Sequence, residues 1–465
     1  MDLSKVNNIF FIGIGGIGMS ALARYFKAQG KTISGYDRTC SELTKQLTKE
    51  GMSIFYEDDS DKIAKDIDLA IYTPAVPLDL NIFKEIAKRS IPLRKRADIL
   101  GTITRGKEMI AIAGTHGKTT TSAILAHMFY QSAIGCTALI GGISNNYQTN
   151  FFSKGDGIFI VEADEYDRSL LFLHPTAAAI NSMDADHLDI YGVEQSLQET
   201  YNEFANQIDK KGFLILHKGL ESHIFTDVKI LTVSIDNSHA NYFADNIRIE
   251  NGYYHFDLFM PDGVITNLVF GGHGAINVLN AVTASAIALN YGIDKGVIRD
   301  ALENFSGVRR RFDFKIRTKE FALIDDYAHH PKEIESALLS VKELYPKKKI
   351  TAIFQPHLYS RTRDFAEGFA KTLNIADEII LLDIYPAREN PIAGISSSLI
   401  AEKITKEEVQ IVSKEHLIEK LIDQAPEIVV MLGAGDIDRL AEPVENALRK
   451  FWNYNNDKPY QKELK

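Results

Sequence analysis

The sequence predicts an α/β protein of three domains, each built around a mainly parallel sheet. Short apolar runs typical of buried strands alternate with helix-like runs in three successive segments, and most of these apolar runs end in a glycine turn or a polar cluster. A chain of 465 residues has room for three domains. We expect their boundaries near residues 1–104, 105–312 and 313–465.

Composition narrows the class of protein. The net charge of -10 argues against broad nucleic-acid binding, which needs a basic surface. No apolar run approaches the roughly 18 residues of a membrane span, so we expect no membrane insertion. The two cysteines, Cys40 and Cys136, suit a reducing compartment. We therefore expect a cytoplasmic protein.

The first segment carries a dinucleotide-binding pattern. A strand at 9–12 runs into Gly13-x-Gly15-x-x-Gly18, a helix at 19–29 follows, and a strand at 32–36 ends at Asp37. This order predicts a Rossmann-like domain with a pyrophosphate at the helix N-terminus and a hydroxyl near the acidic residue. Both a nicotinamide dinucleotide and a UDP-sugar have these groups. The candidate residues are Gly13, Gly15, Gly16, Ile17, Gly18, Met19 and Asp37.

A basic cluster closes this segment at Arg94, Lys95 and Arg96. Charge runs of this kind commonly face solvent, so a solvated linker is one interpretation.

The second segment opens with a phosphate-binding turn. A strand at 109–113 meets a polar turn, and a helix follows from Thr120. Backbone N–H groups and the helix dipole favour an anion here, Lys118 can reach outer phosphates, and the Thr119 hydroxyl can bind Mg²⁺. The standard motif has a glycine where Ile112 stands, so this turn is shorter. The candidate ATP-binding residues are Gly114, Thr115, His116, Gly117, Lys118, Thr119 and Thr120.

Two acidic clusters follow expected strands at 158–161 and 177–180, and they predict a site for Mg²⁺ or Mn²⁺ at the sheet edge. Thr119, Glu162 and His187 are the candidate ligands. Histidine is unusual on a hard cation, so His187 either binds the metal or orients a carboxylate or water. For Asp184 and Asp189, helix capping and surface loops are the alternatives.

The rest of the second segment is less regular. We expect a helix at 197–208, strands at 213–216, 230–233 and 264–270, and a helix at 276–291 after a glycine turn. Near the start of this last helix, Asn277 and Asn280 either contact an adenine edge or cap the helix. The run Arg309–Arg311 is either solvated or delivers a guanidinium to the γ-phosphate.

The third segment places polar clusters after four expected strands, at 322–324, 350–354, 378–382 and 428–432. Clusters at one sheet edge predict a binding site in a second Rossmann-like domain. We expect the polar tail at 455–465 to fray.

Together the segments offer a pyrophosphate site, a triphosphate site and a polar pocket, which suggests a ligase driven by ATP. A carboxylate would attack the γ-phosphate to form an acyl phosphate, and an amine would then displace phosphate to form an amide. Closure of the third domain over the second would exclude water.

Eight motifs resemble those of the Mur ligases of peptidoglycan synthesis, and they cover nearly the whole chain. They are GIGGIGMS at 13–20, GTHGKTTT at 114–121, EADE at 162–165, DHLD at 186–189, GVRRRF at 307–312, DDYAHHP at 325–331, FQPHLYSRT at 354–362 and GAGDI at 433–437. Two positions depart from the family pattern, with Ile276 where a histidine is usual and Ala328 where a glycine is usual. An alanine fits there if its φ is below zero.

The resemblance implies a fold, a reaction and site residues. It implies an ATP-dependent ligase that joins L-alanine to the lactyl carboxylate of UDP-N-acetylmuramate, and a monomer or homodimer. It implies that Lys118, Glu162, His187 and Arg310 are catalytic. It further implies that Asn277, Arg310 and Asp325 contact ATP, and that Tyr327, His357, Tyr359 and Arg361 lie near the amino acid.

Three alternatives remain at this stage. One is a recycling ligase that attaches a murein tripeptide to the same sugar nucleotide. Another is an NAD-dependent oxidoreductase, which the first segment alone suggests. The last is a nucleotide-dependent regulatory protein without catalysis.

Overall fold

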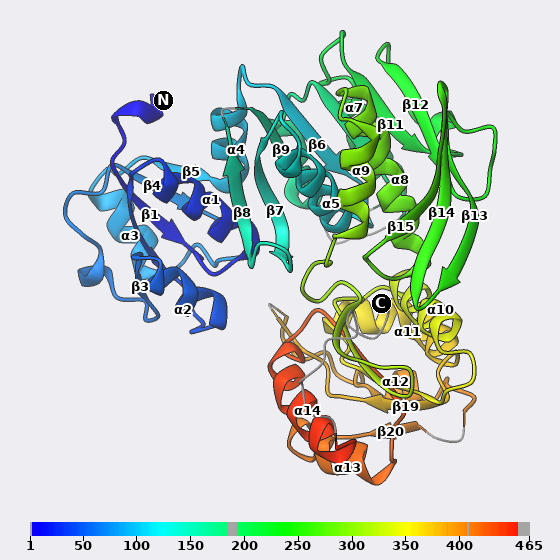
Figure 1. Ribbon diagram of the computed structural model, residues 1–465. Helices are drawn as coiled ribbons and strands as arrows, with labels where there is room; N and C mark the ends of the chain where they lie inside the picture. The colour runs from blue at the N-terminus through cyan, green and yellow to red at the C-terminus, as the bar shows by residue number, and fades with distance from the viewer. Residues whose placement is uncertain are drawn as a thin grey trace. The chain divides into compact units, whose positions relative to one another are not determined.

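The protein contains three sheets, which a computed structural model describes for residues 2–155, 157–184, 191, 193–387, 389–406 and 409–453 (Figure 1). The described chain divides into two compact units. One comprises Met1–Asp245, Asp257–Leu268 and Leu279–Phe305, and the other comprises Asn246–Phe256, Val269–Val278 and Ser306–Lys465. The α/β class is confirmed, whereas the domain boundaries near 104 and 312 stay a prediction.

The first sheet has five parallel strands in the order β3-β2-β1-β4-β5. The order reverses at β1, so the glycine turn that follows this strand lies at the switch point of the sheet, where such folds bind ligands. The strands are β1 Asn8–Ile12, β2 Thr32–Tyr36, β3 Ser53–Phe55, β4 Leu69–Tyr72 and β5 Leu93–Lys95; the α-helices are α1 Ile17–Ala28, α2 Glu42–Lys49, α3 Asn81–Lys88 and α4 Arg96–Thr104.

The second sheet has ten strands in the order β15-β14-β13-β12-β11-β10-β6-β9-β7-β8. Its central strands are parallel, and β8 is an antiparallel partner of β7. The strands are β6 Met109–Ala113, β7 Cys136–Ser144, β8 Thr149–Lys154, β9 Ile158–Glu162, β10 Ala177–Ile180, β11 Phe213–His217, β12 Lys229–Ser234, β13 Tyr242–Glu250, β14 Tyr253–Met260 and β15 Gly263–Phe270; the helices are α5 Lys118–Gln131, α7 Glu194–Ala205, α8 Ala275–Asn290 and α9 Lys295–Glu303.

The third sheet has six strands in the order β16-β17-β21-β18-β19-β20, with only β16 antiparallel to its neighbour. Two separate apolar clusters, one containing α10 and α11 and the other α13 and α14, cover the sheet on both faces. The strands are β16 Asp313–Arg317, β17 Ala322–Asp326, β18 Ile350–Phe354, β19 Glu378–Leu381, β20 Val409–Ile411 and β21 Ile428–Leu432; the helices are α10 Pro331–Leu344, α11 Tyr359–Leu373, α12 Ser398–Ala401, α13 Leu417–Asp423 and α14 Asp438–Phe451.

The structure corrects several limits of the sequence analysis. α1 begins at Ile17 instead of residue 19, and α7 spans Glu194–Ala205 instead of 197–208. The helix after the phosphate-binding turn begins at Lys118, two residues before the expected start, because the positive φ of Gly117 ends the turn there. The β7–β8 hairpin and the pair β13–β14 were not predicted, although buried and partly exposed residues alternate along β14. The tail at 455–465 lies outside the described residues. Among the described helices, none has the length and apolar content to cross a membrane.

Candidate active site

The turn after β6 forms a cradle of backbone N–H groups. Gly114 has φ +121°, and a Cβ there would lie 2.8 Å from the backbone nitrogens of Asn181 and Ser182. Gly117 has φ +78° and precedes α5 as its N-cap residue. Because a glycine has no side chain to cap the helix, the first N–H groups of α5 are available to an anion. Both glycines are therefore required by the geometry of the turn.

Lys118 is held inside this cradle by an acidic partner. Its Nζ donates to the carbonyl of Gly114 at 2.6 Å and to the two carboxylate oxygens of Glu165 at 2.9 and 2.8 Å. Burial alone would lower the pKa of Lys118, but the carboxylates of Glu165, Asp164 and Glu162 together outweigh it and raise the pKa. The lysine is therefore a permanent cation at the phosphate-binding turn.

Thr119 and Glu162, the candidate metal ligands, lie next to each other. The Thr119 hydroxyl donates to Oε2 of Glu162 at 3.1 Å, while Ser122 Oγ and the Gly141 N–H donate to Oε1 at 3.1 and 2.5 Å. A hydroxyl and a carboxylate side by side are hard oxygen donors of the kind that Mg²⁺ prefers, so these two residues fit the expected metal. The described residues contain no cluster of three His, Cys, Asp or Glu side chains around them. His187, with its neighbours Asp186 and Asp189, lies outside the described residues.

The rest of the predicted turn is anchored to the loop after β10. The main-chain N–H of His116 donates to Ser182 Oγ at 2.8 Å. Nε2 of the His116 ring lies 3.5 Å from a carboxylate oxygen of Asp184. Thr115 donates its hydroxyl to the carbonyl of Asp184 at 2.8 Å. Thr120 is buried in the first turn of α5. Asp184 therefore supports the turn from a partly exposed loop.

The two candidate asparagines of α8 have different surroundings. Asn280 is buried, and its Oδ1 accepts the Thr121 hydroxyl at 3.1 Å and would lie 2.6 Å from a Cβ on Gly117. It therefore packs against the phosphate-binding turn. Asn277 donates to the carbonyl of His273 at 2.5 Å, a local contact at the start of the helix. Adenine binding by Asn277 stays a prediction.

The glycine turn of the first sheet is held by Asp37. The Gly15 N–H donates to Oδ2 of Asp37 at 2.8 Å, and the Thr39 N–H donates to Oδ1 at 2.9 Å. Gly13 has φ +85°, a conformation that favours glycine. Gly16 is the N-cap of α1 and, as a glycine, leaves the N–H groups of the first helical turn without a side-chain cap. Asp37 thus holds the conformation of the glycine turn. This role is separate from the contact with a ligand hydroxyl that the sequence predicts.

The basic cluster spans the end of β5 and the start of α4, and its last residue, Arg96, lies near the start of α1. Arg96 would lie 2.9 Å from a Cβ on Gly18, and it pairs with Asp164 at 3.4 Å. Lys95 pairs with Asp167 at 2.8 Å. The solvated-linker interpretation is therefore wrong for Arg96, whose guanidinium lies beside the start of α1.

A second group of predicted residues surrounds Arg310 at the edge of the third sheet. Its Nη2 donates to the Gly433 carbonyl at 2.5 Å, its Nε lies 3.7 Å from Asp325, and its guanidinium lies 5.1 Å from the ring centroid of Tyr327. Arg311 lies over the same ring at 5.0 Å. Burial raises the pKa of Asp325 to about 6, although Arg310 acts in the opposite direction. The arginine is thus held in place by a carbonyl, a carboxyl group and a ring.

Two of the four predicted amino-acid residues, Tyr327 and His357, belong to an aromatic row. His329 links Tyr327 to His357, with ring centroids 5.2 and 6.2 Å apart, and His357 stacks on Tyr385 at 5.7 Å. Tyr359 and Arg361 lie in the first turn of α11, beside Ser360, whose hydroxyl donates to Glu389. Ala328 is not among the described residues with positive φ, which agrees with the expectation that alanine is tolerated there.

Several residues of these sites were missed by the sequence analysis. Glu165 lies in the EADE motif, and its position three residues after Glu162 was the available signal. Ser122 and Gly141 carried no signal, since their contacts with Glu162 depend on how α5 and β7 pack. His329 and Tyr385 were visible only as members of polar clusters.

A phosphate-binding turn in one sheet, with doubly wound sheets before and after it in the chain, defines a nucleotide-dependent enzyme built from α/β domains. Family models match three consecutive stretches: the "Mur ligase family, catalytic domain" at residues 8–108, the "Mur ligase middle domain" at 112–288 and the "Mur ligase, glutamate ligase domain" at 310–435. The chain belongs to the Mur ligase family. This result decides against the oxidoreductase alternative.

Curated relatives match over almost the full length. The UDP-N-acetylmuramate–L-alanine ligase of Christiangramia forsetii is 48% identical over 453 residues, with 96% of this chain and 99% of that protein covered. The enzyme of the same name from Flavobacterium psychrophilum is 47% identical, with 96% and 99% covered.

Solved structures of related ligases have a similar fold. The UDP-N-acetylmuramate–alanine ligase of Thermotoga maritima superposes with a TM-score of 0.82 at 28% identity, covering 95% of this chain and 99% of that one. A murein peptide ligase from Psychrobacter arcticus shares the fold at 22% identity, with a TM-score of 0.71 and coverage of 95% and 98%.

Proposed function

We propose that this enzyme joins L-alanine to the lactyl carboxylate of UDP-N-acetylmuramate with ATP as co-substrate, releasing ADP and phosphate, in peptidoglycan synthesis. The observation that carries the proposal is the full-length identity of 48% to a ligase of that name. The Lys118, Thr119 and Glu162 arrangement supports it, because it supplies what phosphoryl transfer needs. A cytoplasmic location fits the two free cysteines, Cys40 and Cys136.

The first step is the transfer of the γ-phosphoryl group to the lactyl carboxylate. The N–H groups at Gly114–Thr119 bind the phosphates, and Lys118 neutralises the charge that develops on them. Thr119 and Glu162 would hold Mg²⁺ or Mn²⁺, with His187 as a further candidate, and the ion would neutralise phosphate charge. We assign Arg310 and Asp325 to the ATP phosphates and Asn277 to the adenine.

The carboxylate oxygen forms a bond to the γ-phosphorus while ADP leaves, so the product of this step is an acyl phosphate. The sugar nucleotide is held through its pyrophosphate by the turn from Gly13 to Met19, and Asp37 lies at the ribose end. Binding energy from these remote groups orients the carboxylate for attack.

In the second step the amine of L-alanine attacks the acyl carbon and inorganic phosphate leaves. We assign Tyr327, His357, Tyr359 and Arg361 to the amino acid, because they place a cation, two phenols and an imidazole at one sheet edge. A guanidinium suits the carboxylate of the amino acid.

The experiment measures phosphate release from ATP with each substrate alone and with both. We expect release to require UDP-N-acetylmuramate and L-alanine together. Equal turnover without the sugar nucleotide would refute the assignment. A panel of alanine, serine, glycine and a murein tripeptide separates the proposal from the tripeptide-recycling alternative, since preference for the tripeptide would favour the latter. Sedimentation measures whether the enzyme is a monomer or a homodimer.

A further inference from the structure

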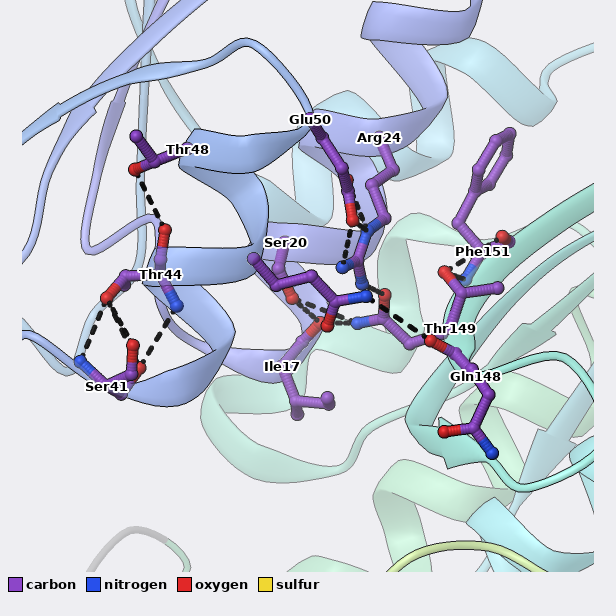
Figure 2. A network of polar contacts seen from close by, with 12 residues as sticks. Ile17, Ser20, Arg24, Ser41, Thr44, Thr48, Glu50, Gln148, Thr149 and Phe151 are labelled. Atoms are coloured by element: carbon purple, nitrogen blue, oxygen red, sulfur yellow. Dashed lines mark hydrogen bonds and ion pairs between the residues drawn. The ribbon is translucent and has the colours of Figure 1, made fainter.

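A buried amide on β8 is bound entirely to helix α1 of the first sheet. Asn150 is 0% exposed, and its Nδ2 donates to the Ile17 carbonyl at 2.7 Å and to Ser20 Oγ at 2.9 Å. Its Oδ1 accepts Nη1 of Arg24 at 2.5 Å. An asparagine has two N–H donors and one carbonyl oxygen, so every polar group of this side chain is used on a single helix. Figure 2 shows the side chains of Ser20 and Arg24 reaching from α1 toward the strand that contains Thr149 and Phe151.

The contact is anchored on the side of the first sheet as well. Arg24 is 5% exposed, and its Nε and Nη2 donate to the Glu50 carboxylate at 2.9 and 2.7 Å. Glu50 follows α2, so the guanidinium joins α1, α2 and β8 in one network, which is buried at Asn150 and Arg24 and reaches the surface at Glu50 (Figure 2). Buried polar groups that are fully hydrogen-bonded rigidify the elements that carry them.

Both ends of this network lie next to the proposed substrate sites. Ile17 is the first residue of α1, whose N-terminus follows the glycine turn assigned to the pyrophosphate. On the other side, β8 pairs with β7, and Gly141 of β7 donates its N–H to Glu162 at 2.5 Å. One hairpin therefore contacts the sugar-nucleotide helix through Asn150 and the proposed metal-binding carboxylate, Glu162, through Gly141.

We infer that Asn150 is a positioning residue, which ties the first turn of α1 to the hairpin that holds Glu162 and so sets the lactyl carboxylate in line with the γ-phosphate. This inference rests on the proposed function. Each substrate would still bind in its own site if the tie were lost. What would be lost is the alignment of the reacting atoms, and a misplacement of about 1 Å can cost about 10²-fold in rate.

The test uses the full-length enzyme with three substitutions. Asn150→Asp keeps the size and the acceptor for Arg24 but removes both N–H donors. Ser20→Ala is a milder second variant that removes one acceptor on α1, and it is available if Asn150→Asp does not fold. Thr137→Val is the matched control, since Thr137 is buried in the same hairpin and its hydroxyl contacts Ser153 Oγ at 2.9 Å instead of α1.

Three measurements are compared across these proteins: amide hydrogen exchange of residues 17–24 without ligands, the dissociation constants of UDP-N-acetylmuramate and ATP, and kcat. For Asn150→Asp we expect exchange at 17–24 to rise about tenfold, both dissociation constants to stay within about threefold, and kcat to fall about 10²-fold. Ser20→Ala should change in the same direction by less. Thr137→Val should leave kcat and exchange at 17–24 unchanged.

Unchanged exchange at 17–24 in both variants would overturn the tie itself. Faster exchange with a wild-type kcat, or an equal loss of kcat in Thr137→Val, would overturn the positioning role. Failure of the proposed function is recognised separately, because the wild-type enzyme would then form no amide from UDP-N-acetylmuramate and L-alanine. The exchange comparison would still decide whether the tie exists.

Discussion

Nζ of Lys118 lies 2.8 Å from Oε2 of Glu165, and the glutamate side chain is only 2% exposed. The ammonium group therefore has a carboxylate partner in the cradle where we expect the phosphates. When a triphosphate binds, its oxygens can replace the carboxylate as the partner of the lysine, so the cation is already in place before the substrate arrives.

Lys118→Ala should lower kcat by at least about 10²-fold, because it removes charge stabilisation of the transferring phosphoryl group. The measurement is steady-state phosphate release with all three substrates saturating. Lys88→Ala is the control, since this lysine side chain is 79% exposed on α3 and touches neither site. Near-normal turnover of Lys118→Ala would remove the lysine from the mechanism.

Gly141→Ala should weaken the metal site without changing any proposed ligand. A Cβ at this position would lie 2.4 Å from Oε2 of Glu162, so the carboxylate must move. Displacing a group that orients a metal ligand costs about 10–100-fold in metal affinity or activity. We expect the Mn²⁺ affinity of the ATP complex, measured by paramagnetic resonance, to fall about tenfold.

Thr137→Val in the same strand should leave Mn²⁺ binding unchanged, because its hydroxyl faces Ser153. Wild-type Mn²⁺ affinity in Gly141→Ala would show that Glu162 does not bind the ion.

The stability of the unit that contains Asp325 should depend on the protonation of this side chain. Burial raises its pKa from 3.8 to about 6. Since the folded pKa is the higher one, the stabilisation is complete below pH 3.8 and is lost as the pH rises through about 6. By linkage the loss is on the order of 2–3 kcal/mol.

Trp452 is the only tryptophan and stacks on Phe321 at 4.4 Å, so its fluorescence reports unfolding of this unit in urea. Relative to Asp325→Asn, which cannot ionise, the wild-type free energy of unfolding should fall between about pH 4 and 6. Parallel pH profiles of the two proteins would contradict the shift.

His357→Ala should raise the KM for L-alanine about tenfold and leave the KM for ATP nearly unchanged. A hydrogen bond to a charged group contributes about 1.5–3 kcal/mol, which corresponds to this factor or more. Initial rates at varied amino acid and fixed ATP give the comparison, with the exposed His223→Ala as control. An equal rise in both KM values would argue against a contact with the amino acid.

Much of the fold was predictable because buried parallel strands have a strong local signal. The predicted limits of β6, β10, β18 and β21 agree with the structure, since each is a continuous apolar run with a polar or glycine boundary. The β7–β8 hairpin was not predictable in the same way. Its pairing depends on β9 and α1, which lie elsewhere in the chain.

The candidate site shows the same division. The placement of Lys118 and Thr119 at the glycine turn and of Glu162 at a strand end was predictable from local sequence, and their roles stay a prediction. Glu165 as the partner of Lys118 was not predictable, although the motif contains it. Which carboxylate meets the ammonium depends on the path of the loop after β9.

By itself, the sequence determined the α/β class, the two glycine turns and the family, since these follow from periodicities and motifs within a few residues. Only the tertiary structure decided that Gly141 and Ser122 hold Glu162 and that Asn150 holds α1. The physical reason is that hydrogen bonds need partners within about 3 Å. Packing, and not distance along the chain, brings such partners together.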